Sequence, residues 1–109
     1  MANSSTGLDE NIAAALSYLL GWVTGIIFFL LEPDRPFIRF HAAQSIVTFS
    51  SISIAMFILS WVPFIGYFIS ALLGLLAFIL WLILIIKAYQ GERYKLPIAG
   101  DLAEKLAAK

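Results

Sequence analysis

Few polar side chains lie inside the long apolar part of this sequence, and four of them follow one spacing. His41, Gln44, Thr48 and Ser51 are separated by three, four and three residues, so on a helix they lie on one face. From a helix start at His41, Ser51 would lie about 15 Å along the axis. Three roles are open for this polar stripe: hydrogen bonding between neighbouring helices, a groove that contacts a solute or peptide, and an interface for a partner membrane protein.

Catalysis and metal binding have little support among these residues. His41 is the single histidine and cysteine is absent. Its nearest acids, Glu32 and Asp34, are spaced by proline, and one imidazole with two such acids is a poor ligand set. No serine lies at helical spacing from a residue that could act as its general base, so the sequence lacks the pair of side chains that nucleophilic hydrolysis requires. We therefore expect neither an enzyme, nor a metal, nor a cofactor.

Two stretches of the chain contain no charged residue, residues 11–31 and 41–86, and the second contains the polar stripe. A membrane helix needs about 20 apolar residues, and Val62-Pro63 with Gly66 divides the longer stretch. Hydrophobic residues make up 61% of the chain and charged ones 13%, against about 25% charged in soluble domains. The sequence predicts an all-α integral membrane protein with three transmembrane helices. They span about 11–31, 41–62 and 66–86 in a single membrane domain, residues 1–109, with a tail over 87–109.

The basic residues predict how these spans are oriented. All seven Lys and Arg residues lie in the first loop or in the tail, and none lies in the N-terminal segment or the second loop. The positive-inside rule then places the N-terminus outside and the tail in the cytoplasm of a multi-pass plasma-membrane protein. The zero net charge gives no field that would recruit nucleic acid. The candidate cytoplasmic basic residues are Arg35, Arg39, Lys87, Arg93 and Lys95.

Small residues recur every four positions on two of the predicted helices. This spacing lines one helix face and lets backbones approach closely. The packing could occur within one chain or between copies, so the expected partners are the lipid bilayer and other membrane proteins or a second copy. The candidate packing residues are Ser17, Gly21, Gly25, Gly66, Ser70 and Gly74.

Several blocks also resemble a known family. Residues 11–18 (NIAAALSY), 39–45 (RFHAAQS) and 87–92 (KAYQGE), with Leu96-Pro97 and Gly100-Asp101, are similar to small uncharacterised prokaryotic membrane proteins. That family is grouped with the Tic-twenty-like import component of the chloroplast inner envelope. The resemblance implies a three-span membrane protein of unassigned function and brings no catalytic residues. The chloroplast relatives have four spans and act in protein import.

Two functions from different classes follow. The first is a non-enzymatic membrane protein that binds partner proteins as a scaffold, an assembly factor or a protein-translocation accessory. The alternative is a subunit of a homo-oligomeric transporter or channel for small solutes, because three helices alone rarely enclose a pathway. An intramembrane carboxylate, which a proton-coupled exporter would be expected to carry, is absent from residues 11–31 and 41–86.

Overall fold

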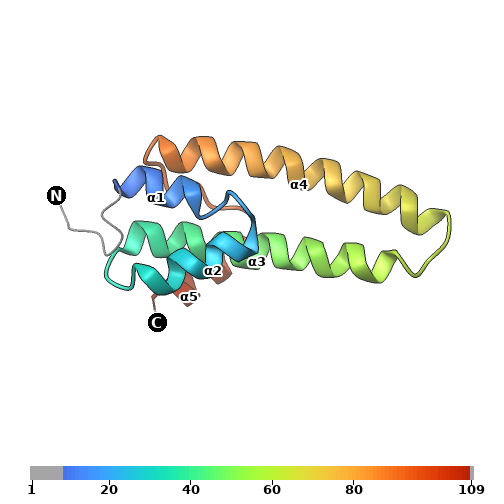
Figure 1. Cartoon of the computed structure of the whole chain (residues 1–109), viewed down its shortest axis with the longest axis horizontal. Coiled ribbons are helices and arrows are strands. Elements are labelled where there is room, and N and C mark those ends of the chain that lie inside the picture. Colours follow the sequence, from blue (N-terminus) through green and yellow to red (C-terminus); the bar gives the residue numbers. More distant parts are fainter. Residues whose placement is uncertain (1–8, 109) are drawn as a thin grey trace.

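The computed structural model describes residues 9–108, which form five helices: α1 (Glu10–Leu16), α2 (Trp22–Leu31), α3 (Pro36–Leu59), α4 (Ile65–Tyr89) and α5 (Ala99–Ala107). Helices α3 and α4 form a long antiparallel pair. Helices α1, α2 and α5 gather around the half of this pair that holds the start of α3 and the end of α4 (Figure 1). No other helix of residues 9–108 covers the other half of the pair.

The long pair supplies the candidate membrane-crossing elements. Helices α3 and α4 have 24 and 25 residues with mean hydropathies of 1.8 and 3.0, and these two helices are long and apolar enough to cross a membrane. At about 1.5 Å per residue each is longer than the roughly 30 Å hydrocarbon layer. The predicted helices 41–62 and 66–86 are therefore present, although α3 begins earlier, at Pro36, and α4 ends later, at Tyr89.

The predicted single span over residues 11–31 is corrected by the structure, because this segment folds as two short helices. Helix α1 ends at Leu16 and α2 begins at Trp22. Gly21 lies between them with a φ of 63°, a backbone conformation that glycine adopts without steric cost. The carboxylate of Glu10, at the start of α1, lies 3.4 Å from the guanidinium of Arg35, which follows α2. Both open ends of the α1–α2 hairpin therefore lie at the same end of the molecule.

This arrangement does not confirm the predicted topology. A spanning helix would separate the N-terminal segment from the first loop by the width of the bilayer. The Glu10–Arg35 ion pair instead brings the start of α1 to the loop before α3, and the closed end of the hairpin lies partway along α3 and α4 (Figure 1). The described part of the chain thus has two candidate spans, with the α1–α2 hairpin packed beside one half of them.

In the turn between α1 and α2, backbone carbonyl groups accept hydrogen bonds from side chains, as a turn in apolar surroundings requires. The Ser45 hydroxyl donates to the Gly21 carbonyl at 2.7 Å, and the Trp81 indole N–H donates to the Leu19 carbonyl at 3.1 Å. The Thr24 hydroxyl donates to the Ser17 carbonyl at 3.1 Å. Irregular backbone is tolerated at membrane depth only where such partners exist. Side chains from α2, α3 and α4 therefore make this turn possible.

The tail folds back onto α3 after α4 ends. Residues 91–98 run back along the molecule, and α5 then returns toward the end where α4 finishes (Figure 1). Ala103 of α5 is fully buried against Phe40 and Ala43 of α3. The tail is therefore part of the packed half of the molecule.

The opposite half of the α3–α4 pair has no covering element within the described residues. Its apolar side chains are largely exposed, with Trp61 at 76% and Phe64 at 85%. A surface of this kind is stable in lipid, where exposed apolar side chains cost nothing. Within the described residues, the hydrogen-bonded network of Tyr18, His41 and Gln44 therefore lies in the other half.

Candidate functional site

The hydrogen-bonded centre of the packed half joins the hairpin, α3 and the tail. The Tyr18 hydroxyl lies 2.6 Å from His41 Nδ1, and Gln44 Nε2 donates to the same hydroxyl at 3.0 Å. His41 Nε2 lies 2.9 Å from the backbone carbonyl oxygen of Glu92. The side chains of Tyr18, His41 and Gln44 are each fully buried. We call this group of three side chains the polar centre.

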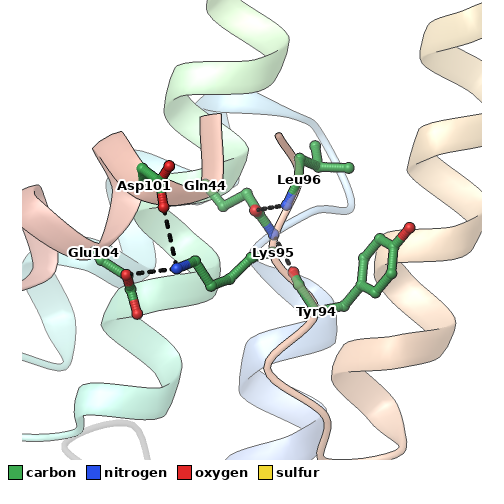
Figure 2. A network of polar contacts seen from close by, with 6 residues as sticks. All are labelled: Gln44, Tyr94, Lys95, Leu96, Asp101 and Glu104. Carbon is green, nitrogen blue, oxygen red and sulfur yellow. Dashed lines mark hydrogen bonds and ion pairs between the residues drawn. The ribbon is translucent and has the colours of Figure 1, made fainter. Parts of the chain in front are cut away.

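Gln44 is the residue that fixes the tail. Its amide nitrogen donates to the Tyr94 carbonyl at 2.8 Å, and its amide oxygen accepts the Leu96 N–H at 2.8 Å. Figure 2 shows the Gln44 side chain reaching the extended tail between these two residues. Because a carbonyl only accepts and an N–H only donates, the two contacts also fix which end of the amide is oxygen. The Gln44 side chain thus supplies this extended segment of the tail with the two backbone hydrogen bonds that a neighbouring β-strand would otherwise provide.

The proton positions in the polar centre follow from these partners. The Glu92 carbonyl only accepts, so His41 Nε2 carries a proton and Nδ1 of the neutral ring accepts from the Tyr18 hydroxyl. Tyr18 can then accept from Gln44. Gln44 thus donates to Tyr18, Tyr18 donates to His41, and His41 donates to the Glu92 carbonyl of the tail. The donors and acceptors of these three side chains are hydrogen-bonded to one another and to the tail backbone, so the arrangement holds the hairpin, α3 and the tail together.

The other two residues of the predicted polar stripe do not join the polar centre. Thr48 is buried, and its hydroxyl has no hydrogen-bond partner within the described residues. Ser51 is exposed. Both line a cavity of about 460 Å³ between α3, α4 and the tail. The stripe is therefore divided, with His41 and Gln44 binding the hairpin and tail while Thr48 and Ser51 face this cavity.

The small residues of the first segment serve the hairpin. A Cβ on Gly25 would lie 2.9 Å from the Ala42 carbonyl oxygen, so a larger residue would push α2 away from α3. Gly21 combines its positive φ with a Cβ position 3.3 Å from Phe49. The Ser17 hydroxyl donates to the Ala14 carbonyl at 2.6 Å. All three residues lie inside one chain's fold.

The small residues of α4 differ among themselves. A Cβ on Gly66 would collide with the Leu59 carbonyl oxygen, so glycine is required where α3 and α4 approach at their turn. The Ser70 hydroxyl is buried without a partner in the described chain. A Cβ on Gly74 would make only ordinary contact, 3.8 Å from Met56. Close packing along this face is therefore limited to its first turn.

The candidate arginines gather at the end of the molecule that holds the polar centre. Arg35 is 3% exposed and pairs with the acid that begins α1. Arg39 donates to the Phe29 carbonyl at 2.8 Å, and its guanidinium carbon lies 3.9 Å from the centre of the Phe29 ring. The Arg93 guanidinium lies 5.2 Å from the centre of the Phe40 ring. These contacts tie α2 and the tail to α3.

The candidate lysines pair with acids of the tail. Lys87 lies 3.5 Å from the Glu92 carboxylate. Lys95 lies 3.1 Å from Asp101 and 2.8 Å from Glu104 (Figure 2). Hydrogen bonds to the Glu104 and Asp101 carboxylates raise the pKa of Lys95 above its ordinary value. Each lysine thus has an acidic neighbour.

Within residues 9–108, no group of three or more His, Asp or Glu side chains is placed to hold a metal ion. His41 faces Tyr18 and a backbone carbonyl. The arrangement around His41 is therefore one of hydrogen bonds.

Sequence reasoning misses one of the three members of the polar centre, Tyr18, and the backbone groups that the centre binds. It places Tyr18 in the interior of a membrane helix, although a tyrosine within an apolar segment is itself a signal because its hydroxyl needs a buried partner. The acceptors at Glu92 and Tyr94 and the donor at Leu96 are backbone groups. Residue types carry no signal for them, so only the fold could reveal them.

Comparison with known proteins identifies relatives over nearly the whole chain. A UPF0132 membrane protein of Methanocaldococcus jannaschii is 49% identical over 105 residues, which are 96% of this chain and 94% of that protein. A second protein of the same organism and description is 50% identical over 99 residues, 91% of this chain and 71% of that protein. A UPF0132 membrane protein of Archaeoglobus fulgidus is 49% identical over 98 residues, 90% and 95% of the two chains.

These relatives bear on both the location and the resemblance predicted above. Together with helices α3 and α4, they identify a membrane protein. They lend no support to the grouping with the Tic-twenty-like import component. No solved structure matches the chain. A family model described as the magnetosome magnetite crystal formation protein family matches residues 9–103. The chain therefore belongs to this family, the MamF/MmsF family.

Proposed function

We propose that this chain is a non-enzymatic membrane protein that binds other membrane proteins, as a scaffold, an assembly factor or a translocation accessory. The observation that carries the proposal is the polar centre. The buried side chains best suited to chemistry are Tyr18, His41 and Gln44. Their hydrogen bonds join them to one another and to the chain's own tail. What remains for interaction is the molecule's outer surface.

The proposed orientation places the packed half at the cytoplasmic face of the plasma membrane. Helices α3 and α4 cross the bilayer, and the α1–α2 hairpin enters and leaves it from the cytoplasmic side. Support comes from the basic residues, since those of the first loop and those of the tail both lie at the end opposite the α3–α4 turn. The turn at residues 60–64 carries no lysine or arginine and would face outward.

The partner surface in this proposal is the uncovered half of the α3–α4 pair. Phe57, Trp61, Phe64 and Phe68 are each at least 66% exposed there. Large aromatic side chains contribute strongly to protein interfaces. The family description concerns magnetite crystal formation, and within the described residues no group of three or more His, Asp or Glu side chains is placed to hold a metal ion. The proposal therefore rests on protein contacts.

Site-specific photo-crosslinking in cells tests this function. A photoreactive amino acid at Phe68 should give a discrete adduct with another membrane protein. The matched control is Leu30, which is 70% exposed on α2 at the opposite end of the α3–α4 pair, and it should give lipid adducts or none. Equal adduct patterns at both positions, or adducts with lipid alone, would contradict the proposal.

A second candidate is a subunit of a homo-oligomeric transporter or channel. The observation that favours it is the pair of hydroxyl side chains, Thr48 and Ser51, on one cavity wall. This function requires water in the cavity. Cysteines at both positions would then react with small water-soluble thiol reagents and crosslink to a second copy, whereas the scaffold function predicts protection.

A further inference from the structure

Helices α2 and α5 pack along the same stretch of α3. The Arg39 side chain of α3 donates to the Phe29 carbonyl of α2 at 2.8 Å and to the Ala107 carbonyl of α5 at 3.5 Å. One turn further along α3, Ala43 packs against Ala103 of α5, and the Phe29 side chain packs against the same cluster. The two helices therefore lie at the same level along the long axis of the molecule.

At this common level, the outward surfaces of the two helices differ in polarity. The exposed side chains of α2 are apolar, with Ile26 at 40% and Leu30 at 70%. On α5, the side chain of Asp101 is 71% exposed and that of Glu104 is 43% exposed. We call the exposed charged residues on and beside α5 the charged face: Lys95, Asp101, Glu104 and Lys105. The packed half thus has one apolar surface and one charged surface at the same level.

Lipid suits the surface of α2 and does not suit the charged face. In the proposed orientation the α1–α2 hairpin enters the bilayer, so α5 reaches the same depth as α2. Exposed charges are unfavourable in hydrocarbon, and charged side chains at membrane depth face protein or water. The ammonium of Lys95 lies between the carboxylates of Asp101 and Glu104 (Figure 2), but all three side chains keep an open outer surface. The charged face therefore requires a polar surface against it.

The charges of this face are complementary to those of a second copy. Within residues 9–108, Lys105 forms no ion pair, and Glu104 binds Lys95 through Oε1 while its Oε2 accepts no hydrogen bond. Consecutive residues of a helix point about 100° apart, so Glu104 and Lys105 lie on opposite flanks of this face. A twofold axis along the bilayer normal keeps two copies in the same orientation. It places Lys105 of each copy beside Glu104 of the other.

We propose that the charged face binds the charged face of a second copy of this chain, in a symmetric pair held by two Lys105–Glu104 ion pairs. The face has two basic and two acidic residues, so two copies bring no net charge together. The pairing covers the charges with protein and leaves the apolar side chains of α2 in lipid. This inference rests on the proposed orientation. It uses a different surface from the uncovered half of α3 and α4, so crosslinking at Phe68 tests the proposed partner binding separately.

Cysteine crosslinking in native membranes tests this pairing, because the chain has no cysteine of its own. Ala108 is exposed and follows Asp101 by seven residues, so both lie on one side of the helix. Ala108→Cys should give a crosslinked dimer with a short bismaleimide. The matched control is Gln90→Cys, which is exposed where α4 ends and should give little dimer. Absence of the Ala108→Cys dimer, or equal dimer yields at the two positions, would overturn the proposal.

A charge exchange tests the two ion pairs in the same assay. With Ala108→Cys present, Lys105→Glu or Glu104→Lys places like charges opposite each other in a pair of identical copies, and each should lower the dimer yield about tenfold. Lys105→Arg keeps the charge and should crosslink as well as the unchanged face. Coexpressed, differently tagged copies of the Lys105→Glu and Glu104→Lys variants again bring opposite charges together, so mixed dimers should reach the original yield. Unchanged yields in the single variants, or mixed dimers as rare as the identical pairs, would overturn the proposed ion pairs.

Discussion

Replacing Gln44 with leucine should release the tail from the packed half of the molecule. The substitution keeps an apolar side chain of similar size and removes three hydrogen bonds: those to the Tyr18 hydroxyl, to the Tyr94 carbonyl and from the Leu96 N–H. Hydrogen bonds between membrane helices average about 0.6 kcal/mol each. The three together give an expected loss of about 2 kcal/mol in the free energy of unfolding.

Two measurements separate tail release from general damage. The free energy of unfolding in one detergent gives the size of the loss. Limited trypsin digestion reports on the tail directly, because Arg93 and Lys95 flank Tyr94 in the segment that Gln44 holds. Cleavage after these residues should become several-fold faster in Gln44→Leu. Ser53→Ala, which changes an exposed side chain of the same helix, should change neither measurement.

The reasoning is refuted by one clear result. If Gln44→Leu unfolds with the wild-type free energy and its tail resists trypsin as the wild type does, the polar centre does not hold the tail. A loss of stability with an unchanged tail would equally contradict the structure, because two of the three lost bonds go to the tail backbone.

Two further predictions concern packing and pH. Gly25→Ile should destabilise the protein by more than about 2 kcal/mol, because a Cβ at this position would already crowd α3. Gly74→Ile should change the melting temperature little, because a Cβ there would make only ordinary contact. Equal melting temperatures for the two variants would contradict this prediction. Since the pKa of Lys95 is raised above its ordinary 10.5 by Glu104 and Asp101, the ion pairs should strengthen tail attachment below that pH and lose effect as pH rises through the raised pKa. Limited digestion with a protease that is active at alkaline pH should cleave the tail faster as the pH rises through the raised pKa of Lys95. Lys95→Met should abolish this pH dependence of the cleavage rate.

The long helices were predictable because local signals agree with the fold. Pro63 and Gly66 divide an uncharged stretch long enough for two spans, and the structure turns there. The start of α3 at Pro36 was less visible, because Arg35 and Arg39 interrupt the apolar pattern. Their contacts with Glu10 and Phe29 are tertiary and let the helix include charged residues.

The break of the first apolar segment could not be read from hydropathy. Residues 11–31 have the length and composition of a span, and Gly21 alone does not distinguish a packing face from a turn. The turn depends on the Ser45 hydroxyl and the Trp81 indole, which arrive from α3 and α4. The spacing of His41 and Gln44 did identify two members of the polar centre, whereas their partners are largely backbone groups of the tail.

The central structural claim is that residues 11–31 form a hairpin whose two ends meet at one end of the molecule. A double variant, Glu10→Cys with Arg35→Cys, tests it most directly, because these side chains are 3.4 Å apart in the structure. A short thiol-specific bismaleimide added to native membranes should join the two introduced cysteines within one chain, detected as a mobility shift, because such a reagent covers the distance that the shortened side chains leave open. A spanning helix would separate the two introduced cysteines by more than about 30 Å. Failure to crosslink in a folded protein whose two introduced thiols label from opposite sides of the membrane would contradict the hairpin.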